Sequence, residues 1–214
     1  RFPLTIGGDH SIAMGSISGV SSALEEEGET LSVMWFDAHA DMHTEQSSES
    51  KNIHGMPLAT LCGLGDGSLT PWIPPGVASI SALNSAVVGA RAVDEAEKLH
   101  CTKHGLQVFY SSEVESEGLQ QIVKRSTESF KSQKNLHISF DLDVLDPTEA
   151  PGVSTPERNG VRLEDCLQAI KMLSQSFNVV SADFVELNPS KDLENKTAKA
   201  AVCLASSLFY TGLV

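Results

Sequence analysis

The sequence predicts an α/β fold of three layers, in which a mainly parallel sheet is covered by helices on both faces. Two observations support this prediction. Short apolar runs rich in strand-forming residues alternate along the chain with longer segments of helical periodicity. The short runs are continuously apolar, which is typical of strands that are buried on both faces, as in a parallel sheet. The alternation then places helices between successive parallel strands.

Four apolar runs predict strands over 2–6, 31–36, 136–140 and 179–185. Two shorter runs predict further strands over 86–89 and 107–110. Helical spacing of apolar residues predicts helices over 11–27, 92–104 and 161–174, the first two ending at Gly28 and Gly105. Polar or Gly/Pro/Ser-rich stretches predict loops over 43–52 and 63–75. No internal repeat or linker divides the chain, so we expect one catalytic domain over residues 1–214.

Composition excludes several classes of partner. The chain has 214 residues and a formal net charge of −13. Such an acidic surface repels nucleic acids and anionic membranes. No apolar run approaches the roughly 18–20 residues that a membrane span needs. The cysteines are far apart and form no CxxC pair, which argues against a disulfide scaffold and for a reducing compartment; they are Cys62, Cys101, Cys166 and Cys203. We therefore expect a cytoplasmic protein. A mitochondrial location stays open, because the sequence begins at Arg1 rather than Met.

Each of the four main strand runs ends at acidic residues or histidines. In open α/β sheets, ligands bind beyond the carboxyl ends of the strands. These strand ends contribute His10, Asp37, His39, Asp41, Asp141, Asp143 and Glu186. Residues two apart in an extended segment point to the same side. Several carboxylates at close range are costly as bare charges, so cations should lie among them.

The donor set favours Mn²⁺, Mg²⁺, Fe²⁺ or Zn²⁺, because it contains carboxylates and imidazoles but no thiolate. It is larger than one ion usually takes from protein. Two ions about 3.5–4 Å apart, sharing carboxylates and a water that becomes the nucleophile, fit it better. Each cluster alone could be a turn, a cap or a solvated loop, but all of these explanations would have to hold together. His100, His104 and His137 receive no functional role, because they lie on a polar helix end or inside a strand.

Six strings carry a family resemblance: GGDHSIAMGSISG (7–19), DAHAD (37–41), NIHGMP (52–57), SFDLDVLDP (139–147), GVSTP (152–156) and VELNP (185–189). In this order they resemble the ureohydrolase (arginase/agmatinase) family, and within it most closely the arginases. The resemblance spans nearly the whole chain. It implies an arginase/deacetylase-like fold, with a strand missing before residue 1 and a shortened C-terminal tail. We therefore expect the chain to be a fragment that is poorly soluble or assembles weakly when expressed alone.

The resemblance implies two Mn²⁺ ions per chain. His10, Asp37, Asp41 and Asp141 would hold one ion, and Asp37, His39, Asp141 and Asp143 the other. The implied reaction is hydrolysis of the guanidinium group of L-arginine to L-ornithine and urea by a metal-bridging hydroxide. His54 would shuttle protons, and Glu186 would pair with the guanidinium. The resemblance also implies a trimer or hexamer.

For the amino-acid end of the substrate, the positions that match the family are His43, Ser48, Ser50, Asn52 and Asp94, with Thr155 nearby. His43 and Lys51 depart from the family pattern, where Asn and Gly are common, so strict arginine specificity stays open. Within the family, the alternatives are a hydrolase of agmatine or of another guanidino or formimino compound. Outside it, they are a single-metal zinc deacetylase and a non-catalytic paralogue, although the paralogue would be free to lose the ligands that this chain retains.

Overall fold

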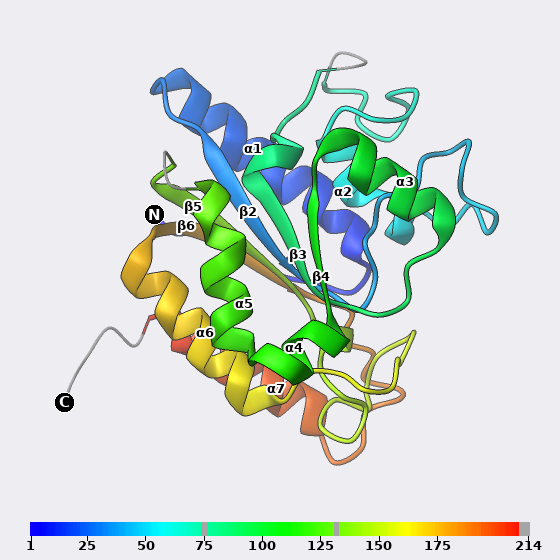
Figure 1. Cartoon of the computed structure of the whole chain (residues 1–214), viewed down its shortest axis with the longest axis vertical. Coiled ribbons are helices and arrows are strands. Elements are labelled where there is room, and N and C mark those ends of the chain that lie inside the picture. The colour runs from blue at the N-terminus through cyan, green and yellow to red at the C-terminus, as the bar shows by residue number, and fades with distance from the viewer. Residues whose placement is uncertain (74–76, 131–132, 210–214) are drawn as a thin grey trace.

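A computed structural model describes residues 1–73, 77–130 and 133–209. Within them the strands form one sheet in the order β1-β6-β5-β2-β3-β4, and every neighbouring pair is parallel (Figure 1). The strands are β1 (Leu4–Ile6), β2 (Leu31–Phe36), β3 (Ser85–Ala90), β4 (Gln107–Tyr110), β5 (Asn135–Asp141) and β6 (Asn178–Val185). All six predicted strands are confirmed, with bounds that shift by two residues at most.

Helices cover both faces of the sheet, which confirms the three-layer prediction (Figure 1). One face carries α1 (Ala13–Glu26), α2 (Pro57–Leu61) and α3 (Glu95–His104). The other carries α4 (Ser111–Glu117), α5 (Leu119–Ser126), α6 (Leu163–Ser176) and α7 (Lys196–Ser207). In the part of the chain that is described, no helix is both long enough and apolar enough to cross a membrane.

The sheet separates two apolar cores. On β2, Val33 and Trp35 pack toward α1, whereas Met34 and Phe36 pack into the core beneath α5, α6 and α7. The whole of β2 is buried. Burial on both faces is the reason why this strand is apolar at every position except Ser32.

All three predicted helices are confirmed but begin two or three residues later than their sequence pattern suggests; α1 begins at Ala13, because Ser11 and Ile12 belong to a short 3-10 helix. α3 begins after Asp94, whose carboxylate accepts from Glu97 N (3.0 Å) while Glu97 accepts from Asp94 N (3.3 Å). This capping box supplies partners for backbone groups that the first helical turn leaves unpaired. α6 begins at Leu163, because Val161 instead pairs with Leu145 in an isolated bridge.

Four helices were not predicted, namely α2, α4, α5 and α7. The predicted loop over 43–52 is confirmed. Residues 63–73 of the second predicted loop contain turns but no helix or strand. Residues 74–75 of the second loop lie outside the described residues.

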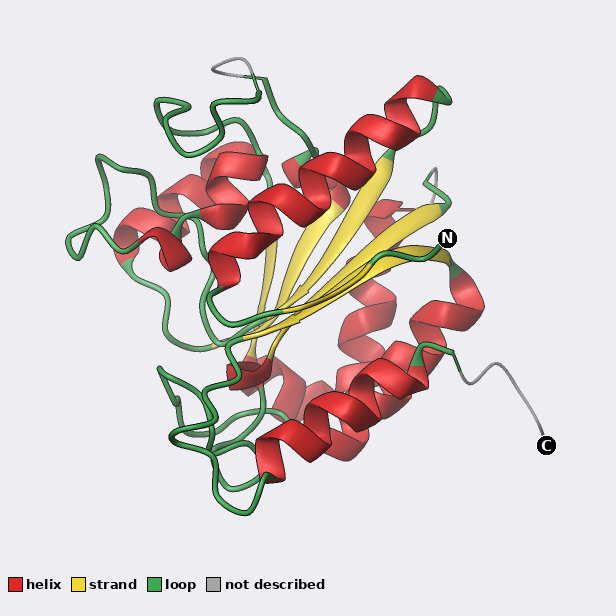
Figure 2. Cartoon of the chain, turned by 180° about the vertical axis from the view of Figure 1, so that it is seen from behind, coloured by secondary structure: helices red, strands yellow, loops and turns green. Residues whose placement is uncertain are grey.

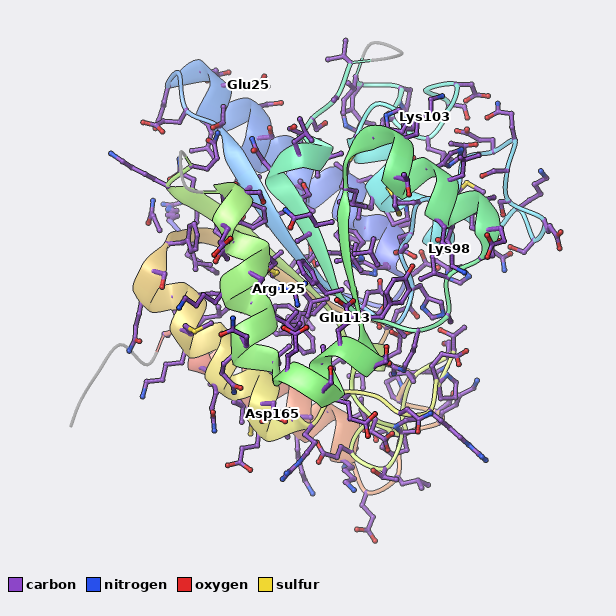
Figure 3. The ribbon with its side chains drawn as sticks, in the orientation of Figure 1. Glu25, Lys98, Lys103, Glu113, Arg125 and Asp165 are labelled. Atoms are coloured by element: carbon purple, nitrogen blue, oxygen red, sulfur yellow. The ribbon has the colours of Figure 1, made fainter. Side chains whose placement is uncertain are left out.

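The outer helices carry charged side chains. For example, Arg125 of α5 lies 3.6 Å from Glu113 of α4 (Figure 3).

β1 is a short strand at one edge of the sheet. It pairs only with β6, through Leu4, Thr5 and Ile6. Leu4 is 38% exposed and Ile6 is 66% exposed. The strand expected before residue 1 stays a prediction.

Gly89 lets β3 pass close to the segment that follows β5. It lies at the irregularity between β3 and β4 and has a φ of 96°, where L residues with a side chain are strained. A Cβ there would collide with Val144, in the short helix that follows β5. Only glycine fits this conformation and this contact at once.

Candidate metal centre

The carboxyl ends of β1, β2 and β5 bring the predicted metal ligands together. Loops gather at this end of the sheet in Figure 2. His10 opens a short helical turn after β1, capped by Asp9, whose carboxylate accepts from Ser11 N (2.9 Å). Asp37 follows β2 directly, and Asp141 is the last residue of β5. Three separate strands therefore position one cluster.

The first ligand group surrounds Nδ1 of His10. This atom lies 3.2 Å from Asp37 Oδ2, 3.3 Å from Asp41 Oδ2 and 3.1 Å from Asp141 Oδ2. The four side chains are almost completely buried. Three carboxylate oxygens and one imidazole nitrogen thus converge on one point, which matches the first predicted ligand set.

The second ligand group surrounds Nδ1 of His39. This atom lies 3.3 Å from Asp37 Oδ1 and 3.1 Å from Asp143 Oδ2. Asp37 therefore turns one oxygen to each group, as expected of a shared ligand. Asp141 belongs to the first group by distance, and its Oδ1 accepts from Asp143 N (2.8 Å). Its predicted sharing between two ions stays a prediction.

The pKa values of the cluster show what its charges do without a cation. Burial raises the pKa of Asp41, and the charge of Asp37 raises it further. Burial and the charge of Asp143 raise the pKa of Asp141 in the same way. Burial would lower the pKa of His10, but hydrogen bonds to Asp141 and Asp37 outweigh it and raise that pKa well above the ordinary value.

His39 and Asp37 respond to each other as well. Burial would lower the pKa of His39, but hydrogen bonds to Asp143 and Asp37 raise it to about 12. Burial would raise the pKa of Asp37, yet hydrogen bonds from His10 and His39 bring it below its usual range. Protons on His10 and His39 therefore offset part of the negative charge of the aspartates. Divalent cations would take the place of these protons.

Asp41 supplies the observation that tests the fit of a cation. Its Oδ2 is buried and lies 3.3 Å from His10 Nδ1, but it accepts no hydrogen bond from any residue that the structure describes. A buried acceptor without a partner costs roughly 1–3 kcal/mol, more when it is charged. Asp41 also has a φ of 51°, in the left-handed region. A cation beside His10 would satisfy this oxygen. The residues present therefore fit a metal ion.

The sequence did not predict the roles of two neighbours of the ligand groups, Trp35 and Arg91. The indole of Trp35 stacks on the His10 ring at 4.1 Å and donates from Nε1 to Asp37 Oδ2 (2.8 Å). Arg91 donates to the carbonyls of Gly89 and Asp143 (2.9 and 2.6 Å) and so joins β3 to the loop after β5. Their positions within or just after apolar strands hid these roles.

A cavity of about 490 Å³ opens beside His39 and Asp41. Its walls include six of the predicted substrate and catalytic positions, namely His43, Ser48, Ser50, Asn52, His54 and Asp94. Arg91 and Glu97 also line it. The loop over 43–52 and the start of α3 therefore face each other across one polar cavity, next to the ligand groups.

A third group of possible ligands lies on the rim of this cavity. His43 Nε2 is 3.1 Å from Asp94 Oδ2 and 3.7 Å from Glu97 Oε2. Burial raises the pKa of Glu97. The Asp94 side chain is 54% exposed. His43 is thus paired with Asp94, which is predicted to meet the substrate, and with Glu97.

Glu186 and Thr155 are not among the residues that line this cavity. Glu186 has a φ of 65°, and its Oε1 accepts from His10 N (2.8 Å). Burial raises its pKa. Thr155 donates from Oγ1 to Asp143 Oδ2 (3.1 Å). Thr155 therefore contacts a predicted metal ligand, and its predicted place near the amino-acid end of the substrate stays a prediction.

Comparison with known proteins identifies the family. The model of the arginase family matches residues 1–210. An arginase from Bacillus caldovelox is 41% identical over 210 residues, which cover 98% of this chain and 69% of that protein. The chain belongs to the arginase family. Like its relatives, this arginase-family chain is a hydrolase that acts on amidine or guanidino groups.

Solved structures agree with this assignment. The crystal structure of an arginase from Bacillus cereus has a TM-score of 0.92 and 40% identity, covering 100% of this arginase-family chain and 73% of that one. A hypothetical agmatinase from Burkholderia thailandensis has a TM-score of 0.76 and 26% identity, covering 97% and 57% of the two chains. Both sequence and structure are thus more similar to the arginase.

Proposed function

We propose that the chain hydrolyses L-arginine to L-ornithine and urea and that two Mn²⁺ ions are its resident cofactors. The observation that carries this proposal is the placement of Asp37. Its two carboxylate oxygens face two separate ligand groups, beside a polar cavity, in a chain of the arginase family. A single-metal site needs no such shared carboxylate.

His10, Asp37, Asp41 and Asp141 would hold one ion, and Asp37, His39, Asp141 and Asp143 the other. A donor set rich in carboxylates suits Mn²⁺, a harder cation than Cu⁺. When bound, such ions supply a water activated for attack at neutral pH. A guanidinium carbon is stabilised by resonance, so attack on it also needs a held and oriented substrate.

Glu186 would orient the guanidinium group. Its Oε1 is engaged with His10 N, while no described residue donates to its Oε2. Because burial raises the pKa of Glu186, a cationic partner would favour its ionised form. Charge-assisted hydrogen bonds from a guanidinium are strong and directional. Glu186 can therefore turn the carbon of the substrate toward the ligand groups.

His54 would carry protons. It lies in a short helical turn (Ile53–Gly55) on the cavity wall and is close enough to Glu186 to influence its pKa electrostatically. Imidazole titrates near neutral pH and can both accept and donate a proton. His54 can therefore pass a proton from the water of the cavity to the departing amine nitrogen.

The far side of the cavity would hold the amino-acid end. Asp94 offers a carboxylate to the α-ammonium, and the hydroxyls of Ser48 and Ser50 with the Asn52 amide offer donors to the α-carboxylate. Lys51 turns away, since its Nζ donates to the carbonyl of Glu45 (2.8 Å). Of the two departures from the family pattern, only His43 therefore lines the cavity and bears on substrate choice.

The test is urea release after Mn²⁺ loading, with arginine and agmatine compared at equal concentration. We expect two ions per chain by metal analysis and faster turnover of arginine. Ser50→Ala should slow arginine turnover and leave agmatine turnover unchanged, because agmatine has no carboxylate. One ion per chain, or faster turnover of agmatine, would contradict the proposal.

We also propose that residues 1–214 form one catalytic domain and that the protein acts as a trimer or hexamer in the cytoplasm. The single sheet supports the first statement. The four cysteines are all free, which suits a reducing compartment. The family resemblance supports the oligomer, which sedimentation of the Mn²⁺-loaded protein would test.

A further inference from the structure

A row of polar side chains runs through the interior of the sheet toward the metal centre. On the face covered by α1, β2 contributes the apolar Val33 and Trp35. At the same level, β5 contributes His137 and Ser139, which lie in register with Ser181 and Asp183 of β6. These four side chains are at most 1% exposed. The proposed mechanism uses none of them.

Asp183 is the centre of this row. Its Oδ1 accepts from Ser139 Oγ (2.6 Å), and its Oδ2 accepts from His137 Nε2 (2.9 Å) and from Ser16 Oγ of α1 (3.0 Å). Burial would raise the pKa of Asp183, but the charge and hydrogen bond of His137 outweigh it and lower that pKa. Asp183 is therefore an ionised carboxylate that can only accept hydrogen bonds.

The direction of the next hydrogen bond follows from this. Ser139 has one hydroxyl proton, and it points to Asp183. Ser139 Oγ also lies 2.9 Å from His10 Nε2. Because the hydroxyl proton is already used, Oγ must accept there and His10 Nε2 must carry a proton. Nδ1 is then the only ring nitrogen of His10 that can offer a lone pair, and it faces the three carboxylates of the first ligand group.

Stability alone does not require this arrangement. Buried ionic groups are often no more stabilising than well-packed apolar residues, because they lose their solvation. β2 shows that apolar residues fill the same layer. A metal-binding histidine, by contrast, needs its second nitrogen held by a hydrogen-bond partner that selects the tautomer.

We propose that Asp183 is a positioning residue that acts through Ser139 to hold the His10 proton on Nε2, leaving Nδ1 to bind a cation. His137 supports Asp183 by donating to its second oxygen. The inference rests on the cation site of the proposed function, but not on the identity of the substrate.

The experiment measures Mn²⁺ affinity by competition with a chelator in Asp183→Asn, Ser139→Ala and the double variant. Loss of a partner in the second layer of a metal site typically costs 10–100-fold in metal affinity. We expect each single variant to weaken the binding of one Mn²⁺ by about tenfold or more. The Mn²⁺ affinity of the double variant should be no lower than that of the more severe single variant, because both changes break the same series of hydrogen bonds.

Ser16→Ala is the matched control. It removes a serine hydroxyl from the same carboxylate, but that hydroxyl has no contact with His10. Its Mn²⁺ affinity should stay within about twofold of the wild type. Effects of Asp183→Asn and Ser139→Ala that multiply in the double variant, or an equal loss in Ser16→Ala, would show a merely structural role and overturn the proposal.

A second readout follows the proton itself. Nitrogen-15 NMR of histidine-labelled, Zn²⁺-loaded protein reports which ring nitrogen of His10 carries hydrogen, with the His10 signal assigned by its loss in His10→Asn. We expect Nε2–H in the wild type and a mixture of tautomers in Ser139→Ala. Wild-type affinity and tautomer in Ser139→Ala would overturn the proposal even if Asp183→Asn failed to fold. Because neither readout uses urea release, a wild type that binds Mn²⁺ but does not hydrolyse arginine would refute only the proposed function.

Discussion

Asp41→Asn should stabilise the metal-free protein and at the same time weaken metal binding. The Oδ2 atom of Asp41 is buried without a hydrogen bond from any described residue, and the neighbouring charge of Asp37 repels it. Asparagine has nearly the same shape and carries no charge, so it removes the repulsion by Asp37. It also tolerates the left-handed backbone of position 41. The substitution therefore removes a penalty in the metal-free state and a ligand in the metal-bound state.

The expected size follows from these contacts. An unsatisfied buried acceptor costs roughly 1–3 kcal/mol, so a net gain of about 1–2 kcal/mol is reasonable. In a chain of this length that gain raises Tm by about 2–8 °C. Mn²⁺ at about 100 times its Kd stabilises the wild type by roughly 2.7 kcal/mol, or about 5–11 °C. The variant loses most of this, so the order of the two Tm values should reverse when Mn²⁺ is added.

The pH dependence has a definite sign. Folding raises the pKa of Asp41 above its unfolded value, so the ionised carboxylate destabilises the metal-free fold at higher pH. This penalty shrinks as pH falls through the raised folded pKa toward the unfolded value near 4. The advantage of Asn at position 41 should therefore be largest near pH 8 and should fade on acidification.

Thermal unfolding followed by circular dichroism, with EDTA or with Mn²⁺, checks this prediction. Asp192→Asn is the matched control, because the Asp192 carboxylate accepts from Thr197 N (2.9 Å) and Ala198 N (3.0 Å), far from the metal centre in the sequence. It should lower Tm equally in both conditions. A lower Tm for metal-free Asp41→Asn, or the same change with and without Mn²⁺, would refute the reasoning.

Three further predictions concern catalysis, protons and packing. His54→Asn should lower kcat for arginine by about 10²–10⁴-fold with little change in Mn²⁺ content, as expected for a group that transfers protons; unchanged steady-state urea release would remove that role. Mn²⁺ affinity should rise with pH between 6 and 9. The folded pKa values of His10 and His39 lie above the ordinary value, and each histidine must lose a proton to bind a cation. A flat pH profile in chelator competition would contradict this. Gly89→Ala should lower the free energy of unfolding by at least about 2 kcal/mol, since it combines a left-handed backbone with a collision. Gly28→Ala, at a φ of 75° and with open space around it, should lower it by only about 1 kcal/mol. Equal Tm shifts in the two variants would contradict the collision.

Periodicity predicted the sheet well and the helices less well. The strands are short and largely apolar, because both faces of the sheet are buried. α5 was missed although it buries Leu119, Ile122, Val123 and Ser126 at helical spacing, because only three of its eight residues are apolar. α4 escaped because Val114 is its only buried residue among those described. Short helices packed by a few contacts leave too weak a pattern, and tertiary packing decides them.

The ligand groups were predictable because the topology of a parallel sheet brings strand ends to one edge. The sequence could not predict how the ligands are oriented. Trp35 reads as one more apolar residue of a strand, although its indole both stacks on His10 and donates to Asp37. Likewise, Thr155 follows an unpatterned loop, so only the fold shows that it donates to Asp143.

β5 shows how such interior roles can be recognised. Its residues Leu136, Ile138 and Phe140 face one apolar core, while the alternate positions carry His137 and Ser139. Alternation of this kind normally predicts a strand with one face in water. Here β5 lies between β2 and β6, and helices cover both faces, so the polar face is buried as well. Buried polar groups need partners, so alternation in a central strand indicates an internal hydrogen-bond network. In this protein that network ends at His10. Orienting this histidine therefore explains why one buried face of β5 is polar.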